Sequence, residues 1–146
     1  MTILGLLNKF ETLDTDVVIT QAMQATEQDL AEANRDQLFN GFDRDGKRLN
    51  RYRSDVYARK KNSRNPLPGY GNPDLRNTGA FYQGIRVTVN GNTVEVGSSD
   101  DKEEQLQVKY GNIFGLGGPF KDGYLDQNLG PAIRQKITAA TGLKFG

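Results

Sequence analysis

Apolar and polar residues alternate strictly on both sides of the dipeptide Asn90-Gly91. A period of two is typical of a strand with one buried face, and Asn-Gly is the strongest short-range signal of a two-residue hairpin turn. With this turn, the expected cross-strand pairs are Val87 with Val94, Ile85 with Val96, Thr88 with Thr93 and Arg86 with Glu95. The pattern therefore predicts an antiparallel hairpin over residues 85–96, with apolar pairs on one face and polar pairs on the other.

A second pattern has the spacing of a helix. Small or apolar residues recur at Ile19, Ala22, Met23, Thr26, Leu30 and Ala33, and Gly and Pro are absent from residue 15 until Gly41. Asp14 or Thr15 can cap the start. We therefore expect a helix from about residue 15 to 39. Because its small side chains bury little area, this helix needs support from a sheet or a neighbouring subunit.

Shorter patterns predict the remaining elements. Residues 65–73 hold three prolines and two glycines and should form an extended connector. Ser98 or Ser99 can cap a short helix that ends at Gly111, and Pro131 can begin a helix that runs to about Ala140. Asp43-Arg44-Asp45-Gly46 lacks the ligand positions of a calcium loop and is interpreted as a turn between Phe42 and Leu49. The apolar, glycine-rich segment 113–120 should pack over the sheet or across a subunit boundary.

Together these patterns predict one domain of α+β class over residues 1–146. Its long N-terminal helix (15–40) would pack on a small antiparallel sheet built around the central hairpin. A basic extended arm and connector (41–74) would precede the hairpin core (75–116). A loop and a C-terminal helix (117–146) would complete the domain.

Composition restricts the chemistry. The 146 residues include no His, Cys or Trp, so the commonest general base, metal ligand and thiol nucleophile are absent. The acidic cluster Asp100, Asp101, Glu103 and Glu104 leaves a carboxylate enzyme open, but acids at a helix start are ordinarily partners of the helix dipole. We expect no enzyme, no metal and no cofactor, and no segment approaches the roughly 18 apolar residues of a membrane span.

Charge is distributed unevenly although the net charge is only +1. Residues 1–36 hold seven acidic side chains against Lys9 and Arg35, whereas residues 43–64 hold nine basic side chains against three acidic ones. Such asymmetry suits a protein that docks on copies of itself or on a charged neighbour. Two alternatives stay open: a solvated helix followed by a basic loop, and a nucleic-acid-binding accessory protein that uses the basic segment 44–64. The residues expected to contact an acidic partner or DNA are Arg59, Lys60, Lys61 and Arg64. Reversing the charge of Lys60 and Lys61 is expected to block assembly and leave the subunit folded.

The segment Asp74-Leu75-Arg76-Asn77-Thr78-Gly79-Ala80-Phe81 leads into the hairpin and then into a stretch ending at Tyr110-Gly111. This order resembles the Leu-x-x-Thr-Gly core of small morphogenesis proteins of tailed bacteriophages, namely neck, head-tail joining and tail-completion proteins. The preceding pattern of a long helix, Asp45-Gly46 and a basic segment with Tyr52 and Tyr57 is also similar to that group. The resemblance spans about residues 15–116.

The resemblance implies a structural virion protein, assembled in the host cytoplasm. It would form a homo-oligomeric ring of about six or twelve copies around the DNA passage, in contact with portal, adaptor or tail proteins and non-specifically with DNA. Leu75 would anchor its turn in the core, and Gly79 would permit a backbone geometry that other residues resist. Thr78, Phe81, Asn90 and Gly91 would complete the structural motif. The acidic helix and the basic arm would supply the two unlike surfaces that a ring requires.

Overall fold

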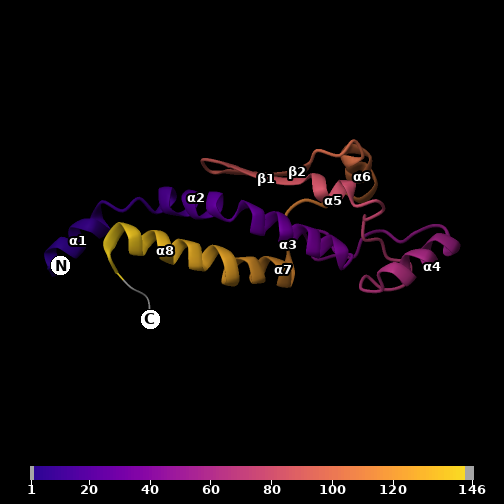
Figure 1. Ribbon diagram of the computed structural model, residues 1–146, viewed down its shortest axis with the longest axis horizontal. Helices are drawn as coiled ribbons and strands as arrows, with labels where there is room; N and C mark the ends of the chain where they lie inside the picture. The colour runs from indigo at the N-terminus through magenta and orange to yellow at the C-terminus, as the bar shows by residue number, and fades with distance from the viewer. Residues whose placement is uncertain (1, 144–146) are drawn as a thin grey trace.

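The structure of the protein is a computed structural model that describes residues 2–143, without the side chain of Phe10. Its elements are α1 (Ile3–Glu11), α2 (Thr15–Ala25), α3 (Glu27–Phe39), α4 (Asp55–Arg64), α5 (Ala80–Gly84), β1 (Ile85–Asn90), β2 (Thr93–Ser98), α6 (Glu103–Tyr110), α7 (Gly118–Tyr124), the π-helical segment η1 (Leu125–Leu129) and α8 (Gly130–Thr141). They form an elongated molecule in which α2 and α3 run along the middle (Figure 1). The hairpin lies on one side of these helices, and α7 and α8 lie on the other. Helices with one small antiparallel sheet confirm the predicted α+β class.

The core lies between α3 and the inner face of the hairpin. Along β1, buried and exposed residues alternate without exception, as the sequence pattern predicts. The buried side chains that meet there are Leu30, Ala31 and Leu38 from α3, Ile85, Val87 and Val89 from β1, and Phe81 and Ile113 from the flanking segments. The period of two therefore places the apolar face of β1 on the helix layer.

The single long helix predicted over residues 15–39 is wrong in one respect: Thr26 divides it into α2 and α3. The N–H of Thr26 donates to the carbonyl of Met23, and its hydroxyl donates to the carbonyl of Ala22 at 2.8 Å. The same hydroxyl is hydrogen-bonded to the Tyr124 hydroxyl, also at 2.8 Å. The hydrogen bonds from Thr26 to these preceding carbonyls end α2, and the contact with Tyr124 holds Thr26 at the break between the helices. The outer bounds and the Asp14 cap are as predicted, because Asp14 accepts from the N–H groups of Asp16 and Val17.

The hairpin forms, but its predicted register is wrong by two residues. Asn90 pairs with Thr93 and Val87 pairs with Val96, so the turn residues are Gly91 and Asn92 instead of Asn90 and Gly91. Gly91 has a φ of 55°, and Leu75 is the only non-glycine residue with positive φ in the part of the chain that the structure describes. A glycine alone at positive φ in the first turn position matches a type II′ turn, which suits the strand twist as well as type I′. A shift of two residues preserves the faces, so the apolar side remains inside.

Side chains of α2 and α3 bond to the outer backbone edge of β1. Gln24 Nε2 donates to the Val89 carbonyl at 3.3 Å, and the Val89 N–H donates to Glu27 Oε1 at 3.0 Å. Arg35 Nη2 donates to the Ile85 carbonyl at 3.0 Å. On the edge of β1 that faces away from β2, helix side chains therefore bond to both backbone groups of Val89 and to the carbonyl of Ile85.

Two buried amides of α3 hold the segment 113–117. Asn34 donates to the carbonyl of Ile113 at 3.0 Å and accepts from the N–H of Gly115 at 2.9 Å. Gln37 donates to the carbonyl of Gly115 and accepts from the N–H of Gly117, both at 2.9 Å. Each amide thus satisfies one backbone donor and one acceptor, as a neighbouring strand would. This segment packs over the core of its own subunit.

The other elements confirm some expectations and correct others. α8 contains the predicted C-terminal helix and is capped at its end by Gly142, and α6 is capped at its end by Gly111. The N-cap of α6 is Lys102 and not Ser98 or Ser99, because the buried Ser98 hydroxyl donates to the Phe81 carbonyl instead. The predicted extended arm contains a helix, α4, whose first turn is capped by the Ser54 side chain. α1 was not predicted.

The expected turn between Phe42 and Leu49 is present. Phe42 and Arg48 form an antiparallel bridge, and a carboxylate oxygen of Asp43 accepts from the N–H groups of Asp45 and Lys47, both at 2.9 Å. The Asp43 carboxylate therefore stabilises the turn backbone.

Candidate functional site

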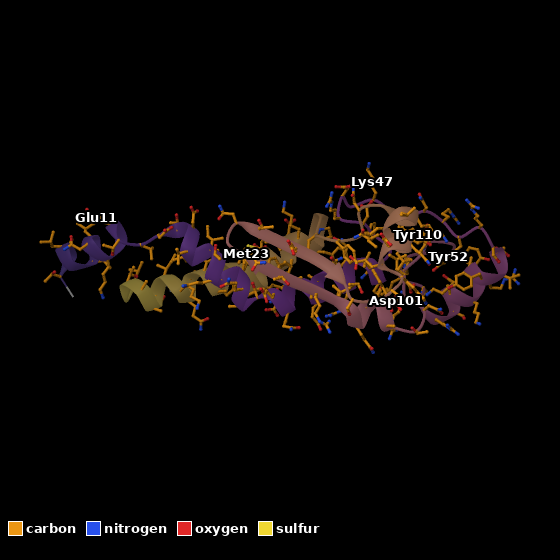
Figure 2. All side chains as sticks on the ribbon, turned by 90° about the horizontal axis from the view of Figure 1, so that it is seen from above. Glu11, Met23, Lys47, Tyr52, Asp101 and Tyr110 are labelled. Atoms are coloured by element: carbon orange, nitrogen blue, oxygen red, sulfur yellow. The ribbon has the colours of Figure 1, made fainter. Side chains whose placement is uncertain are left out.

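A groove of about 520 Å³ lies near the α4 end of the molecule, and we call it the basic groove. Its walls come from the loop 50–54 with one side of α4, from the segment 75–81, and from α6 with Lys102. Figure 2 labels two of the lining residues, Tyr52 and Tyr110, at this end of the molecule. Its lining residues are Asn50, Arg51, Tyr52, Arg53, Ser54, Tyr57, Lys61, Leu75, Arg76, Asn77, Thr78, Gly79, Phe81, Lys102, Leu106, Lys109 and Tyr110. Three stretches of chain that are distant in sequence therefore build one concave surface.

The lining of the basic groove is positively charged. It includes Arg51, Arg53, Arg76, Lys102 and Lys109, and its described lining residues include no carboxylate. Lys109 Nζ lies 5.2 Å from the centroid of the Tyr110 ring, a cation–π distance. Arg51 Nη2 donates to the Tyr70 carbonyl at 3.0 Å, which holds its guanidinium beside the loop 69–71. The groove therefore favours an anionic or acidic occupant.

One further cation of the groove is already paired. Lys61 Nζ lies 2.6 Å from Asp74 Oδ1, and both side chains are more than nine-tenths buried. Lys61 also donates to the Arg76 carbonyl, and Asp74 accepts from Asn65 Nδ2 at 3.0 Å. This buried ion pair fastens α4 to the segment 74–76 and so fixes one wall of the groove. The charge of Lys61 therefore pairs with Asp74 within the same chain and stabilises its fold.

Leu75 has an unusual backbone conformation in that wall. Its φ of 59° is in the left-handed region, which costs a residue with a Cβ of order 1 kcal/mol or more. Asp74 Oδ1 accepts from the Arg76 N–H at 2.9 Å and closes a local turn around Leu75. The Leu75 side chain is half-buried and packs against the core, as the resemblance implies. A residue keeps a strained backbone conformation of this kind only where surrounding contacts hold the backbone in place.

Gly79 also has the expected geometry. Its φ is 93°, it is the N-cap of α5, and a Cβ added there would meet no heavy atom within 4 Å. The need for glycine is therefore conformational. Thr78 is exposed at the rim of the groove, and its hydroxyl accepts from the Ala80 N–H at 3.3 Å.

Aromatic rings form much of the apolar surface of the groove. The Tyr52 and Tyr57 rings meet edge to face with centroids 4.9 Å apart. Burial, and to a lesser extent the charge of Asp74, raises the pKa of Tyr52 well above its ordinary value. At neutral pH the Tyr52 hydroxyl is protonated, as in any ordinary tyrosine, and can donate a hydrogen bond.

The four predicted contact residues do not form one patch. Arg59 pairs with Asp55 on α4 at 3.1 Å, whereas Lys60 and Arg64 are exposed and lie outside the groove lining. Only Lys61 reaches the groove, and it is buried in its ion pair. Contact of the exposed three with a partner or DNA stays a prediction. Asn90 and Gly91 lie at the hairpin turn, away from the groove residues.

Sequence reasoning missed the cations that do gather in the groove. Arg51 and Arg53 belong to the basic stretch that the charge count identifies. Arg76, Lys102 and Lys109 do not, because only the fold brings them beside it.

A second groove of about 510 Å³ has the opposite charge. It lies between α3 and the segment α7–η1 and includes Asp29, Glu32 and Asp36 among its lining residues. Burial, followed by the charge of Glu32, raises the pKa of Asp36, while Arg35 acts in the opposite direction. The molecule therefore presents concave surfaces of both signs.

Within residues 2–143 there is neither a metal-binding cluster nor a helix that could span a membrane. No group of three or more His, Cys, Asp or Glu side chains is arranged to hold a metal ion. Across the same residues, every helix is too short or too polar to cross a bilayer.

Comparisons with known proteins gave no match to a family model, to a curated sequence or to a solved structure.

Proposed function

We propose that this protein is a structural subunit of a ring in the neck or head-tail connector of a tailed bacteriophage. The ring would link portal or adaptor to tail and would line or seal the DNA channel. This role is mechanical and requires no catalysis and no cofactor.

The observation that carries the proposal is the large surface of the isolated chain. It exposes 9237 Å², whereas a compact protein of its mass exposes about 7,500 Å². The excess of roughly 1,700 Å² comes from the elongated shape of the chain, and it leaves room for two contact surfaces of about 800 Å² each, the size that a specific interface buries on one partner. A ring subunit has two such surfaces, one toward each neighbour.

Exposed apolar residues support the same role. Ile3, Val56 and Val108 are 80%, 77% and 87% exposed, and they lie on α1, α4 and α6 respectively. Exposed apolar side chains on several projecting helices favour an assembled state in which other chains cover them.

The resemblance to phage morphogenesis proteins also gains support from the basic groove. Leu75, Thr78, Gly79 and Phe81 of the Leu-x-x-Thr-Gly segment line it together with Tyr110. The two separate parts of the sequence that carry the resemblance therefore meet at one surface. We expect the residues of a contact site common to these proteins to lie together on one surface in this way.

Native mass spectrometry and negative-stain electron microscopy of the purified protein test the proposal. We expect closed rings of about six or twelve copies, alone or after addition of candidate portal or tail proteins. A monomer at every concentration, with and without those proteins, would contradict it.

The basic groove also favours a second candidate, a nucleic-acid-binding accessory protein. Arg51 and Arg53 alternate with Tyr52 and Ser54 along one wall, and basic side chains beside aromatic rings are typical of single-strand binding surfaces. This candidate requires that the isolated subunit bind oligonucleotides with an affinity that falls steeply as salt increases.

A further inference from the structure

We propose that α1 of one copy binds in the basic groove of the next copy, so that subunits join head to tail. This inference rests on the proposed ring and names the contact that would build it.

α1 presents apolar side chains to solvent. Ile3, Leu4 and Leu7 are 80%, 69% and 51% exposed, and their spacing places them on one side of the helix. α1 contacts α8, but that contact leaves these three side chains uncovered. A short amphipathic helix with a free apolar face is the element that grooves of partner proteins bind.

The basic groove offers matching apolar surface. Its lining includes Leu75, Phe81 and Leu106 together with the tyrosines 52, 57 and 110. Branched and aromatic side chains of this kind accommodate leucine and isoleucine by burying them away from water.

Charge complements the apolar match. The chain that follows the exposed face of α1 carries Glu11, Asp14 and Asp16, and Lys9 is its only basic residue before Arg35. The groove lining has five cations without a carboxylate partner within it. α1 itself is neutral, because Lys9 offsets Glu11, so the charge match comes from Glu11 and the acidic residues that follow the helix. Their contact with the groove cations would fix the direction of α1.

The shape of the molecule makes the contact intermolecular. α1 lies at one end of the long axis, while α4, α5 and α6 lie toward the other end (Figure 1). Figure 2 shows the same separation between Glu11 and the groove residues Tyr52 and Tyr110. Because α1 lies far from the groove of its own chain, its binding site must belong to another copy. Two unlike surfaces that meet in this way produce a closed ring when the rotation between copies closes.

The apolar half of the contact is tested with the double substitution Ile3→Gln and Leu4→Gln. Both side chains are exposed, so the subunit should keep its circular dichroism spectrum. The dissociation constant between subunits, measured by sedimentation, should rise at least about tenfold because two buried side chains are lost from the contact. Leu67→Gln is the matched control, since Leu67 is also an exposed apolar residue but lies outside the groove lining and outside α1, and it should leave assembly unchanged.

The charged half is tested by a charge swap. Glu11→Lys with Asp16→Lys, and separately Arg53→Glu with Lys102→Glu, should each weaken assembly. Arg53 and Lys102 line the groove, and substituting glutamate at the start of α6 agrees with the helix dipole. All four substitutions combined in one chain should restore assembly at least in part, because the contact then has reversed charges on both sides.

The outcomes separate this inference from the proposed function. A wild-type protein that never assembles contradicts both. Wild-type rings that persist in the α1 and groove variants contradict the head-to-tail contact and leave the ring intact. Groove variants that assemble normally but lose binding of a labelled single-stranded oligodeoxynucleotide would assign the groove to nucleic acid and overturn the inference.

Discussion

The buried side-chain amides of Asn34 and Gln37 bond to backbone groups of the segment 113–117, as a neighbouring strand would. Gln37 is fully buried and bonds to both Gly115 and Gly117, so its removal leaves a cavity and two backbone groups without partners. We expect Gln37→Ala to lower the free energy of unfolding by about 3 kcal/mol. Urea denaturation followed by circular dichroism measures this loss.

Gln28→Ala is the matched control, because it makes the same chemical change at an exposed position of the same helix. It should change stability by less than about 0.5 kcal/mol. Equal losses in the two variants would show that the bonds of Gln37 to the segment 113–117 contribute nothing.

Adjacent lysines on α4 should respond differently to charge reversal. Lys61→Glu places a second carboxylate beside the buried Asp74, and breaking such a pair costs about 3–5 kcal/mol. The structure thus alters the expectation from sequence that a variant reversed at both Lys60 and Lys61 stays folded. We expect Lys61→Glu to lower the thermal midpoint markedly and Lys60→Glu, at an exposed site, to leave it nearly unchanged. A Lys61→Glu protein with the wild-type midpoint would disprove the structural role of the pair.

At this scale the sequence predicted backbone geometry better than side-chain partners. The need for glycine at position 79 follows from a local motif and is confirmed by its φ. The burial of Lys61 depends on Asp74, which is brought beside it by the turn of the connector, and no local pattern indicates that pairing.

Among the elements, the hairpin turn offers a test of its corrected type. Gly91 has positive φ and open space around it, so Gly91→Ala should cost about 1 kcal/mol through backbone strain alone. Gly123 lies within α7, also with open space, and Gly123→Ala should stabilise the protein by about 0.5–1 kcal/mol through helix propensity. Thermal denaturation shows whether each substitution lowers or raises the stability of the protein. A stabilising Gly91→Ala would contradict the observed turn.

Elements with local signals were predicted, and those that depend on distant contacts were not. α8 has a proline in its first turn and a glycine after its last, and both signals are read directly from sequence. The break between α2 and α3 depends on the bond between Thr26 and Tyr124, which lie 98 residues apart. α4 was missed because its buried residues are only Ala58 and Lys61, so it has no apolar periodicity to detect.

For the whole molecule, the sequence indicated the α+β class and the separation of charge but not the shape. Seven acids before residue 37 and nine basic residues in 43–64 predict unlike surfaces. The elongation arises because α2, α3 and α8 pack lengthwise and α1 extends past them, which is a property of their arrangement (Figure 1). The basic groove could not be predicted for the same reason, since its walls come from three separated stretches.

The side chains on the outer edge of β1 determine how the sheet can grow. Gln24, Glu27 and Arg35 occupy backbone groups that an incoming strand would need. Unprotected edge strands promote aggregation, and helix side chains bonded along an edge prevent it. A third strand would therefore meet occupied backbone groups along β1, so edge-to-edge pairing between copies of the chain is disfavoured at β1 relative to β2.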